Sequence, residues 1–504
     1  MDVFILKPRK DLVTSSKEIK MHNKRNYVYF FSAMCFLYAL PFILHSNLYL
    51  DDVYRSVYGD GSWSPLGRPL ADVITFGLSL NNNYLSDFYP LGIILAILIF
   101  TFIIYFIINR ELSVISSYAL ISLPSLLVSP IFLQNMSYHY DSTAMVIALA
   151  LAVLSFYTSF VKGLHYSLAS VIFLVASLSL YQPCANIFLG LMAANITIKI
   201  KNSHNNKFNQ LILDGALFCC SFVIYYVFVV RLFQLGGQRA TFIEPSELFN
   251  SLLFAFKGVY NIGSLVLTGL VKAAFLLLLA IAAISSIIQA YKYRPTLSGL
   301  VRIFISVSIS CILLLFSAIG TSFLVAEGIT DLRVMVGMSS VVFYLLVVSL
   351  RGIDDKSSYA LTLIPLLVIT SISFQYVNAS SNQRQFEISI LGNVARDVNY
   401  GANSRVYISG VMPLSPQAKV AISAVPFIGR VLPASPPWVS RRLAASIGIG
   451  SVENSWGGDN QELISTVCVR NLSPFIDNSL YSIYNIDDLR LVFFKGSEEI
   501  CSKK

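Results

Sequence analysis

Long apolar runs, separated by short polar stretches, make up roughly the first three quarters of the chain. Most of them approach the roughly 20 residues that a helix needs to cross the apolar part of a bilayer. Proline begins helices well and continues them badly, so Pro183 predicts a tight hairpin turn at Tyr181–Gln182–Pro183 between two short runs. The pattern predicts about eleven membrane-spanning helices, at residues 27–46, 89–108, 113–133, 142–161, 166–181, 183–199, 210–230, 262–290, 301–324, 335–350 and 358–376.

The pattern changes after about residue 377, where polar residues, glycine, proline and asparagine become common and no further apolar run follows. The residues from 377 to 504 are enough for one small domain. Its pattern predicts a helix over 386–398, strands over 404–409 and 489–494, and an irregular proline-rich stretch over 413–438. We therefore expect a mainly α fold: a polytopic helical membrane bundle with a small C-terminal α/β domain.

The composition agrees with a membrane protein. Of the 504 residues, 55% are hydrophobic and 12% are charged, whereas a soluble chain has about 45–50% and about 25%. The net charge of +9 does not indicate nucleic-acid binding, because no basic groove with interleaved aromatic residues is evident. The basic residues lie between the apolar runs instead, where they set the orientation of membrane helices.

The distribution of these basic residues predicts which side of the membrane each loop faces. Seven lysine and arginine residues precede the first apolar run and should hold residues 1–26 in the cytoplasm. An odd number of spans then places residues 377–504 in the periplasm, outside the bacterial inner membrane. The membrane domain, residues 27–376, would present outer loops at residues 47–88, 134–141, 231–261 and 325–334.

The first outer loop holds the most unusual group of side chains. Asp51 and Asp52 follow the first apolar run directly, and Arg55, Trp63 and Arg68 come soon after. A carboxylate can take the proton of an attacking hydroxyl, which is typically worth about 10²–10⁴-fold in rate. Arginines can hold a phosphate leaving group, and aromatic faces suit sugar rings. An ordinary solvated loop is the alternative, but the combination favours sugar transfer at the membrane surface.

Three further outer segments carry candidate binding residues. They are Tyr138, His139 and Asp141 before the fourth run, Tyr181 and Gln182 at the hairpin turn, and Glu327, Asp331 and Arg333 before the tenth run. Asp141 could instead cap the next helix, and the last three charges could be plain interfacial anchors. All of these segments are predicted to lie on the same side of the membrane as Asp51 and Asp52, which favours a single site.

The cysteines and histidines indicate no metal centre. No spacing among them is typical of zinc or of an iron–sulfur cluster, and we predict no dedicated metal site or cofactor. Asp51 and Asp52 could still share a divalent cation with a phosphate. Cys468 and Cys501 both fall in the C-terminal domain, where an oxidising compartment would allow them to pair; a disulfide and two free thiols are equally expected.

Together these segments resemble the bacterial, often phage-associated, glucosyltransferases that modify O-antigen and convert serotype, which are membrane enzymes of the GT-C architecture. The resemblance covers the membrane portion in order and is weakest in the C-terminal domain. It rests on Asp51-Asp52 with Arg55, then Gly67-Arg68-Pro69-Leu70, then Ser137-Tyr138-His139-Tyr140-Asp141-Ser142, then Leu180-Tyr181-Gln182. The family pattern has arginine and phenylalanine where this chain has His139 and Tyr140, which weakens any role carried over to these two positions.

The resemblance implies a donor, an acceptor and a mechanism. The donor would be glucose or a related hexose on undecaprenyl phosphate, supplied by a separate glycosyltransferase and a flippase, and the acceptor would be a lipopolysaccharide O-antigen repeat. Enzymes of this architecture carry a catalytic carboxylate in the first outer loop, which matches Asp52 as the preferred base with Asp51 in support. Attack would be direct, with inversion at the anomeric carbon. The substrates would be bound by Arg55, Arg68, Trp63, Tyr138, His139, Asp141, Tyr181, Gln182 and Arg333.

Other functions of lipid-linked sugars are the alternatives. An O-antigen polymerase or a lipid A glycosyltransferase would act on similar donors. A flippase for lipid-linked saccharides would place polar and charged residues at mid-membrane depth and often shows internal repeats. The apolar runs here are nearly free of charge and no repeat is evident, which favours surface chemistry over transport.

The predicted topology can be tested with alkaline phosphatase, which is active only in the periplasm. A fusion after Lys504 should be active, because an odd number of spans places the C-terminus outside. A fusion after Lys201, in an expected cytoplasmic loop, serves as the control and should be inactive. An inactive C-terminal fusion in a protein that inserts normally would contradict this topology.

Overall fold

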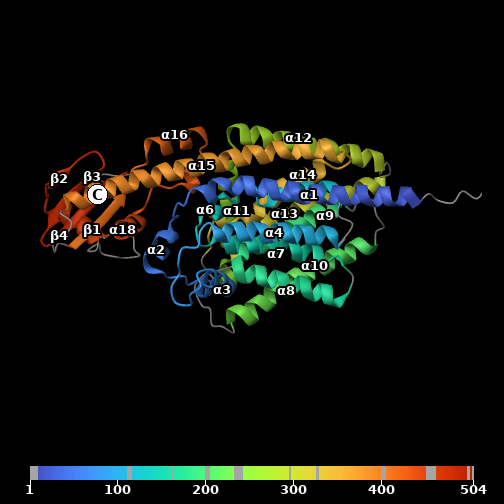
Figure 1. The fold of residues 1–504 in the computed structure, drawn as a ribbon, viewed down its shortest axis with the longest axis horizontal. Helices are drawn as coiled ribbons and strands as arrows, with labels where there is room; N and C mark the ends of the chain where they lie inside the picture. The colour runs from blue at the N-terminus through green and yellow to red at the C-terminus, as the bar shows by residue number, and fades with distance from the viewer. Residues whose placement is uncertain are drawn as a thin grey trace, which may run out of the picture.

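The apolar runs fold into an elongated helical bundle, and the polar C-terminal residues form a small sheet at one end of it (Figure 1). Helix α1 begins at the end of the bundle away from the sheet. The computed structural model describes residues 10–110, 116–161, 163–198, 205–231, 242–293, 297–324, 328–398, 405–449, 461–496 and 500–501. Glu327 lies outside these residues, as do most of the N-terminal segment before α1 and part of the expected outer loop at 231–261.

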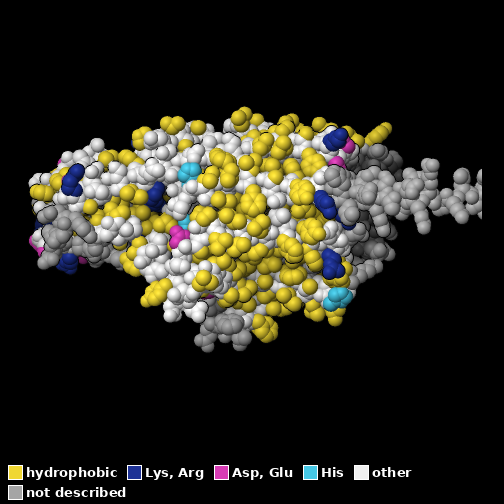
Figure 2. Space-filling view, in the orientation of Figure 1, with side chains coloured by type: hydrophobic (Ala, Val, Ile, Leu, Met, Phe, Trp, Pro, Cys, Tyr) yellow, Lys and Arg dark blue, Asp and Glu magenta, His cyan; other side chains and the backbone are white. Residues whose placement is uncertain are grey.

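Six helical segments in the described part are long and apolar enough to cross a bilayer. They lie in α1 (Lys10–Leu44), α4 (Leu91–Asn109), α8 with α9 (Leu164–Tyr181 and Ile187–Ile198), α10 (Asn205–Ile224) with the π-helix η5 (Tyr225–Arg231), α12 (Gly269–Tyr293) and α15 (Asp355–Asp397). On the face in Figure 2, hydrophobic side chains form a broad band with basic side chains at both ends. The structure therefore fits a helical membrane protein, while the count of about eleven spans stays a prediction.

Shorter helices fill the spaces between these segments. The apolar ones include α3 (Pro69–Leu78), α7 (Ser142–Thr158), α13 (Leu297–Ile319) and α14 (Ser339–Ser349). Single turns of 3₁₀ helix connect them at η1 (Ser64–Leu66), η6 (Pro245–Glu247), η7 (Ser322–Leu324), η8 (Leu332–Val334) and η9 (Val336–Met338).

The predicted turn at Pro183 is confirmed. Helix α8 ends at Tyr181, whose backbone is extended with φ −159° and ψ 100°, and the 3₁₀ helix η3 (Gln182–Asn186) follows. Pro183 lies in the first turn of η3, where its missing N–H costs no helical hydrogen bond. The break places Tyr181 and Gln182 at the junction of two apolar helices.

The expected continuous span at residues 113–133 is wrong. Its described part contains only α5 (Ser117–Ser122) and η2 (Leu123–Leu126), followed by turns that lead to α6 (Leu133–Ser137). Pro124 and Pro130 interrupt the helical hydrogen bonds here. Every residue from 119 to 146 is buried, and irregular backbone at membrane depth is tolerated where protein surrounds it.

The expected eighth span also divides differently. Helix α11 (Leu248–Val266) ends before Leu267, and α12 begins at Gly269, which adopts a φ of +50° that favours glycine. Residues 248–261, expected as part of an outer loop, are therefore helical.

Helix α15 runs through the expected domain boundary at residues 376–377. It is one helix of 43 residues, so the predicted eleventh span and the predicted helix over 386–398 are parts of the same element. Figure 1 shows α15 beside α1, extending from the bundle to the sheet. The small domain is thus attached by a continuous helix rather than by a flexible linker.

The C-terminal domain is a four-stranded sheet with helices, as expected. Its strands β1 (Arg405–Val411), β2 (Ile476–Asp477), β3 (Tyr481–Ile486) and β4 (Leu489–Lys495) lie in the order β1-β4-β3-β2. Strand β1 is parallel to β4, and the other pairs are antiparallel. Strands β1 and β4 confirm the two predicted strands.

The stretch over 413–438 is not irregular as a whole. It contains α16 (Pro416–Ala424), α17 (Ile428–Val431) and the start of α18 (Pro437–Ser446), and α19 (Gln461–Val469) follows later. Pro416 and Pro437 begin their helices, where proline is well tolerated. Two of the prolines that suggested a loop therefore mark helix starts.

Helix α2 (Asp51–Tyr58) links the bundle to the C-terminal domain. Val53 belongs to the hydrophobic core of that domain, together with Ile390 and Val439. The hydroxyl of Tyr49, just before α2, donates to the carbonyl of Val431 at 2.8 Å. The first outer loop is therefore held from both sides.

The structure contains a disulfide between Cys468 and Cys501, with Cα atoms 5.7 Å apart. It closes a loop of 33 residues, for which the chain-entropy model gives about 3–4 kcal/mol of stabilisation. Replacing both cysteines by serine should lower the melting temperature of the C-terminal domain in detergent. Cys219→Ser, at an exposed free thiol, should leave it unchanged. Full alkylation of both cysteines without reductant would show that the bond is absent.

Candidate active site

A strained turn presents the two adjacent aspartates differently. Leu50, just before α2, has φ +43° and ψ −103°, a conformation that costs a residue other than glycine about 1–3 kcal/mol. The turn is held because Asp52 Oδ2 accepts from the Tyr49 N–H at 3.1 Å and the Asp52 N–H donates to the Tyr49 carbonyl at 2.9 Å. As a result Asp52 is fully buried, whereas the side chain of Asp51 is 37% exposed.

The buried carboxylate of Asp52 joins the first outer loop to the turn before α7. It accepts hydrogen bonds from the N–H groups of His139 at 2.7 Å and Tyr140 at 3.4 Å. Burial raises the pKa of Asp52 to about 8, and Asp141 acts in the same direction, against the lowering by Arg55 and the N–H donors. At neutral pH this carboxyl group is therefore mostly protonated, and no solvent reaches it.

Arg55, Asp141 and Trp63 form a second connection between the same two segments. Arg55 Nη1 lies 2.7 Å from Asp141 Oδ2 and 3.8 Å from Asp52 Oδ1. The Trp63 indole Nε1 donates to Asp141 Oδ1 at 2.5 Å, and the Arg55 guanidinium lies 4.5 Å from the centre of the Trp63 ring. Trp63 is 1% exposed, and its ring packs against Arg55 and Asp141; its predicted contact with a substrate stays a prediction.

Arg333 lies at the exposed edge of this cluster. Its guanidinium hydrogen-bonds the hydroxyl of Tyr138 and lies 3.8 Å from Asp51 Oδ2. Its backbone is fixed on both sides: the N–H donates to Gln134 Oε1 at 2.9 Å, and the carbonyl accepts from Tyr181 Oη at 2.6 Å. The side chain remains 22% exposed, so Arg333 presents a partly solvent-accessible cation beside Asp51.

Arg68 reaches the cluster from the start of α3. Its Nε donates to Gln182 Oε1 at 2.8 Å, and its guanidinium lies 4.5 Å from the centre of the Tyr181 ring. Gln182 in turn donates to the Leu66 carbonyl at 2.8 Å. Gly67 has φ +77°, and a Cβ there would lie 2.5 Å from the Tyr225 hydroxyl, so glycine is required at this position.

His139 takes part through its backbone only. Its ring stacks on Tyr89 with centroids 3.9 Å apart, and Nε2 lies 2.8 Å from Asp87 Oδ1. Burial lowers the pKa of His139, against the influence of Asp87. The predicted role of the His139 side chain in substrate binding stays a prediction, because its described contacts are with Asp87 and neighbouring aromatic rings rather than with the arginines.

The other predicted residues form one connected cluster. Direct contacts join Asp52, Arg55, Asp141 and Trp63. Arg333 contacts both Asp51, through its guanidinium, and Tyr181, through its carbonyl. All are contributed by the ends of helices or by the turns between them. The sequence analysis predicted them in loops between membrane helices. Which of them touch substrates stays a prediction.

Several supporting residues were missed by the sequence analysis. Asp72 accepts from the N–H groups of Trp63 and Ser64 at 2.9 Å and 2.6 Å, which fixes the loop that carries Trp63. Arg430 of the C-terminal domain lies 3.1 Å from Asp331. A short-range pattern could reveal Asp72, because it lies in the first turn of α3 after Pro69, but nothing in the sequence places Arg430 beside a membrane loop.

The cluster offers little to a metal ion. Among the residues that the structure describes, no group of three histidine, cysteine, aspartate or glutamate side chains could hold one. The oxygens of Asp52 accept backbone N–H groups and face Arg55, which leaves Asp51 as the open carboxylate of the pair. A divalent cation shared with a phosphate stays a prediction. One open carboxylate is a poor set of ligands for such a cation.

Comparison with known proteins identifies the family. A family model described as Glucosyl transferase GtrII matches residues 40–344, which include every predicted site residue. The chain belongs to the GtrII glucosyl transferase family. It is also 25% identical over 426 residues to an uncharacterized 55.3 kDa protein in the gtrB 5′ region of Salmonella phage P22, across 82% of this chain and 87% of that protein. No solved structure matches. The resemblance to glucosyltransferases is thus confirmed at the level of the family.

The buried carboxyl group predicts a pH-dependent effect of Asp52→Asn on stability. The folded-state pKa of Asp52 is raised from 3.8 to about 8, so folding favours the protonated form. The stability contributed by this proton is fully present below about pH 4 and is lost as pH rises to about 8. The melting temperature of Asp52→Asn relative to wild type should therefore rise between about pH 5 and about pH 8 and then level off.

Thermal unfolding in detergent at several pH values measures this difference. Asp60→Asn, at an exposed position of the same loop, is the matched control and should show no such trend. A difference between Asp52→Asn and wild type that is constant with pH would contradict the raised pKa.

Proposed function

We propose that this GtrII-family protein transfers a hexose, most simply glucose, from undecaprenyl phosphate to lipopolysaccharide O-antigen at the periplasmic face of the inner membrane. The family match supports a glycosyltransferase over a flippase. The phage relative supports O-antigen modification through its place beside gtrB. A polymerase or a lipid A glycosyltransferase has no specific observation in its favour.

The observation that carries this proposal is the pairing of Asp51 with Arg333. Asp51 is 37% exposed and Arg333 is 22% exposed, beside the buried Asp52, Trp63 and Asp141, and the charged atoms of Asp51 and Arg333 are 3.8 Å apart. Sugar transfer from a lipid phosphate needs these two groups: a base for the incoming hydroxyl and a cation for the departing phosphate. Both would lie at the ends of the membrane helices, where a lipid headgroup meets water.

The roles of the two aspartates follow from their exposure. Asp51 is the proposed base, because its side chain is exposed to solvent, and Asp52 is a buried positioning residue. The preference for Asp52 as base was reasonable from the sequence, which does not distinguish neighbouring carboxylates. The burial of Asp52 and its three backbone N–H donors support a positioning role for Asp52 and the role of base for Asp51.

The proposed reaction is a single displacement. The acceptor hydroxyl oxygen bonds to the anomeric carbon while the bond from that carbon to the phosphate oxygen breaks, and the hydroxyl proton passes to Asp51. The polyprenyl phosphate leaves with the electron pair of the broken bond, and Arg333 stabilises its charge. Attack from the side opposite the phosphate inverts the anomeric centre. Arg55, Arg68 and Asp141 hold the walls of the site.

Asp51→Asn should lower kcat by about 10²–10⁴-fold, because it removes the general base while keeping the side chain's shape. Asp52→Asn should retain much more activity, because asparagine resembles the protonated Asp52 that is already present. Turnover of undecaprenyl phosphate-linked glucose by purified protein in O-antigen-bearing membranes measures both. Full activity of Asp51→Asn together with an inactive, correctly inserted Asp52→Asn would reverse the assignment.

The product distinguishes the proposed function from its alternatives. Lipopolysaccharide from cells that express the protein should carry a side-branch hexose on O-antigen. A changed O-antigen chain length would indicate a polymerase, and a sugar on lipid A would indicate a lipid A glycosyltransferase. Unchanged sugar content with altered sidedness of lipid-linked sugar would indicate a flippase.

A further inference from the structure

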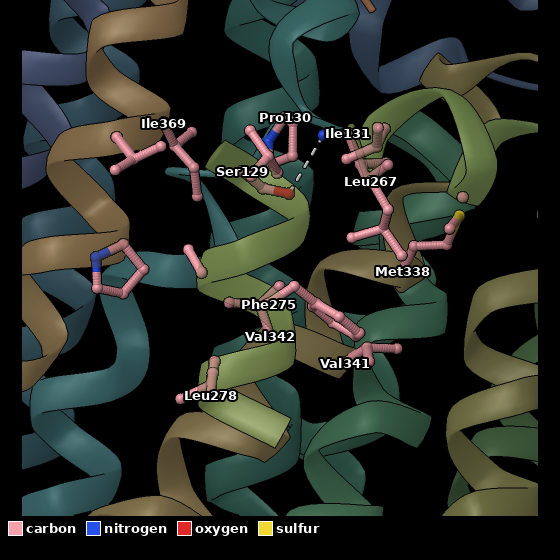
Figure 3. Close-up of a pocket in the computed structure, with 16 residues that line it drawn as sticks. Ser129, Pro130, Ile131, Leu267, Phe275, Leu278, Met338, Val341, Val342 and Ile369 are labelled. Atoms are coloured by element: carbon pink, nitrogen blue, oxygen red, sulfur yellow. Dashed lines mark hydrogen bonds between the residues drawn. The ribbon is translucent and has the colours of Figure 1, made fainter. Parts of the chain in front are cut away.

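An apolar pocket of about 150 Å³ lies within the membrane bundle, between α11, α12, α14 and α15 (Figure 3). Ala274 and Phe275 of α12 form one wall, and Val341 of α14 and Ile369 of α15 form others. The irregular segment around Ile131 completes it. The pocket is thus lined in part by Ser129, Pro130 and Ile131, which lie in turns rather than in a regular helix.

The walls of this pocket select hydrocarbon. Its polar side chain, Ser129, is engaged: its Oγ accepts from the Ile131 N–H at 3.3 Å and from the Ser339 hydroxyl at 2.9 Å. A dry apolar cavity of about 150 Å³ is known to bind a molecule of the size of benzene. One five-carbon isoprene unit has a similar size, so the pocket fits a short piece of a branched lipid chain rather than water.

The pocket is accessible from the side of the bilayer. Helix α12, which forms its outer wall, has only 6% of its candidate membrane window buried inside the protein. Most of the surface of α12 is therefore available to lipid, and a chain can enter beside it without crossing the core of the bundle.

Two segments connect the pocket to the candidate active site. Met338 lines the pocket and lies five residues after Arg333, across the 3₁₀ turns η8 and η9; at about 2 Å per residue this is roughly 10 Å. Ile131 lines it from the other side and lies three residues before Gln134, which bonds the Arg333 N–H at 2.9 Å. A phosphate at Arg333 would therefore have its lipid chain within reach of the pocket.

We propose that this pocket receives the first isoprene unit of the polyprenyl phosphate donor, an inference that rests on the proposed function. The chain emerges from the phosphate held at Arg333 and lies between α12 and α14. Binding the chain here orients the phosphate and the anomeric carbon toward Asp51. The pocket therefore selects donors by the lipid next to the phosphate, while the sugar end is selected elsewhere.

Filling the pocket tests this assignment. Ala274→Phe places an aromatic ring in the pocket, and Ala273→Phe, on the lipid-facing side of the same helix, is the matched control. Ala274→Phe should raise the KM for undecaprenyl phosphate-linked glucose at least about tenfold. This is the loss of affinity expected when about two methylene groups of the lipid can no longer be buried. The KM for the acceptor should not change, and Ala273→Phe should match wild type in both.

A second variant fills the pocket from another helix, in case Ala274→Phe does not fold. Gly263 lines the pocket, and a Cβ built there meets no atom within 4 Å, so Gly263→Leu adds volume without a backbone clash. It should raise the same KM. Donor KM values equal to wild type in both Ala274→Phe and Gly263→Leu would overturn the assignment and would indicate that ordinary bilayer lipid fills the pocket.

A binding readout separates this inference from the proposed function. A polyprenyl phosphate with a photoreactive group in its first isoprene unit should label the peptides that contain Phe275 or Met338, and Ala274→Phe should suppress the labelling. Labelling without sugar transfer by the wild type would leave the pocket assignment standing and refute the proposed function. Transfer without labelling at these peptides would refute the pocket assignment alone.

Discussion

One buried carboxyl group fixes the geometry of this site. Asp52 accepts three backbone N–H groups from two segments far apart in the sequence and lies beside Arg55. Leaving such donors unsatisfied in a buried place costs about 1–3 kcal/mol each, so the contacts strongly favour one arrangement of the two segments. The strained backbone at Leu50 is maintained by the same contacts. Because Asp51 directly precedes Asp52 in the chain, the orientation of the Asp51 side chain is set by the buried Asp52 carboxyl group.

The charge of the cluster depends on this burial too. The predicted site contains the cations Arg55, Arg68 and Arg333 and the carboxylates Asp51, Asp52 and Asp141. The nearby charge of Asp331 is paired with Arg430 at 3.1 Å. With Asp52 ionised, three positive and three negative charges would cancel. With Asp52 protonated, as its raised pKa of about 8 implies at neutral pH, three positive charges face two negative ones. A net positive site at the membrane boundary attracts a phosphate group, so burial of one carboxyl group favours both the geometry and the electrostatics of binding a lipid phosphate.

The sequence predicted local features better than the packing of the helices. Periodicity located the turn at Pro183 and the strands β1 and β4, because each has a local signal: a proline or an alternation. The side of the membrane on which the site residues lie stays a prediction. Periodicity failed at residues 113–133, where apolar composition is the same whether a segment spans the bilayer or folds back inside the protein. It also could not rank Asp51 and Asp52, since their difference is burial, which is decided by the turn at His139, 87 residues away from Asp52. The contact of Arg430 with Asp331 has no local signal at all.

The position of α2 connects the candidate site to the C-terminal domain, which lies beyond the end of the family match at residue 344. Neighbouring residues of this short helix point into different cores: Asp52 is bonded to the turn before α7, and Val53 packs in the core of the C-terminal domain. Helix α15 joins the same two regions as one element of 43 residues. With a rigid helix on one side and α2 on the other, the domain cannot shift without moving the backbone that carries Asp51. The C-terminal domain therefore holds the backbone of the first outer loop in place through α2.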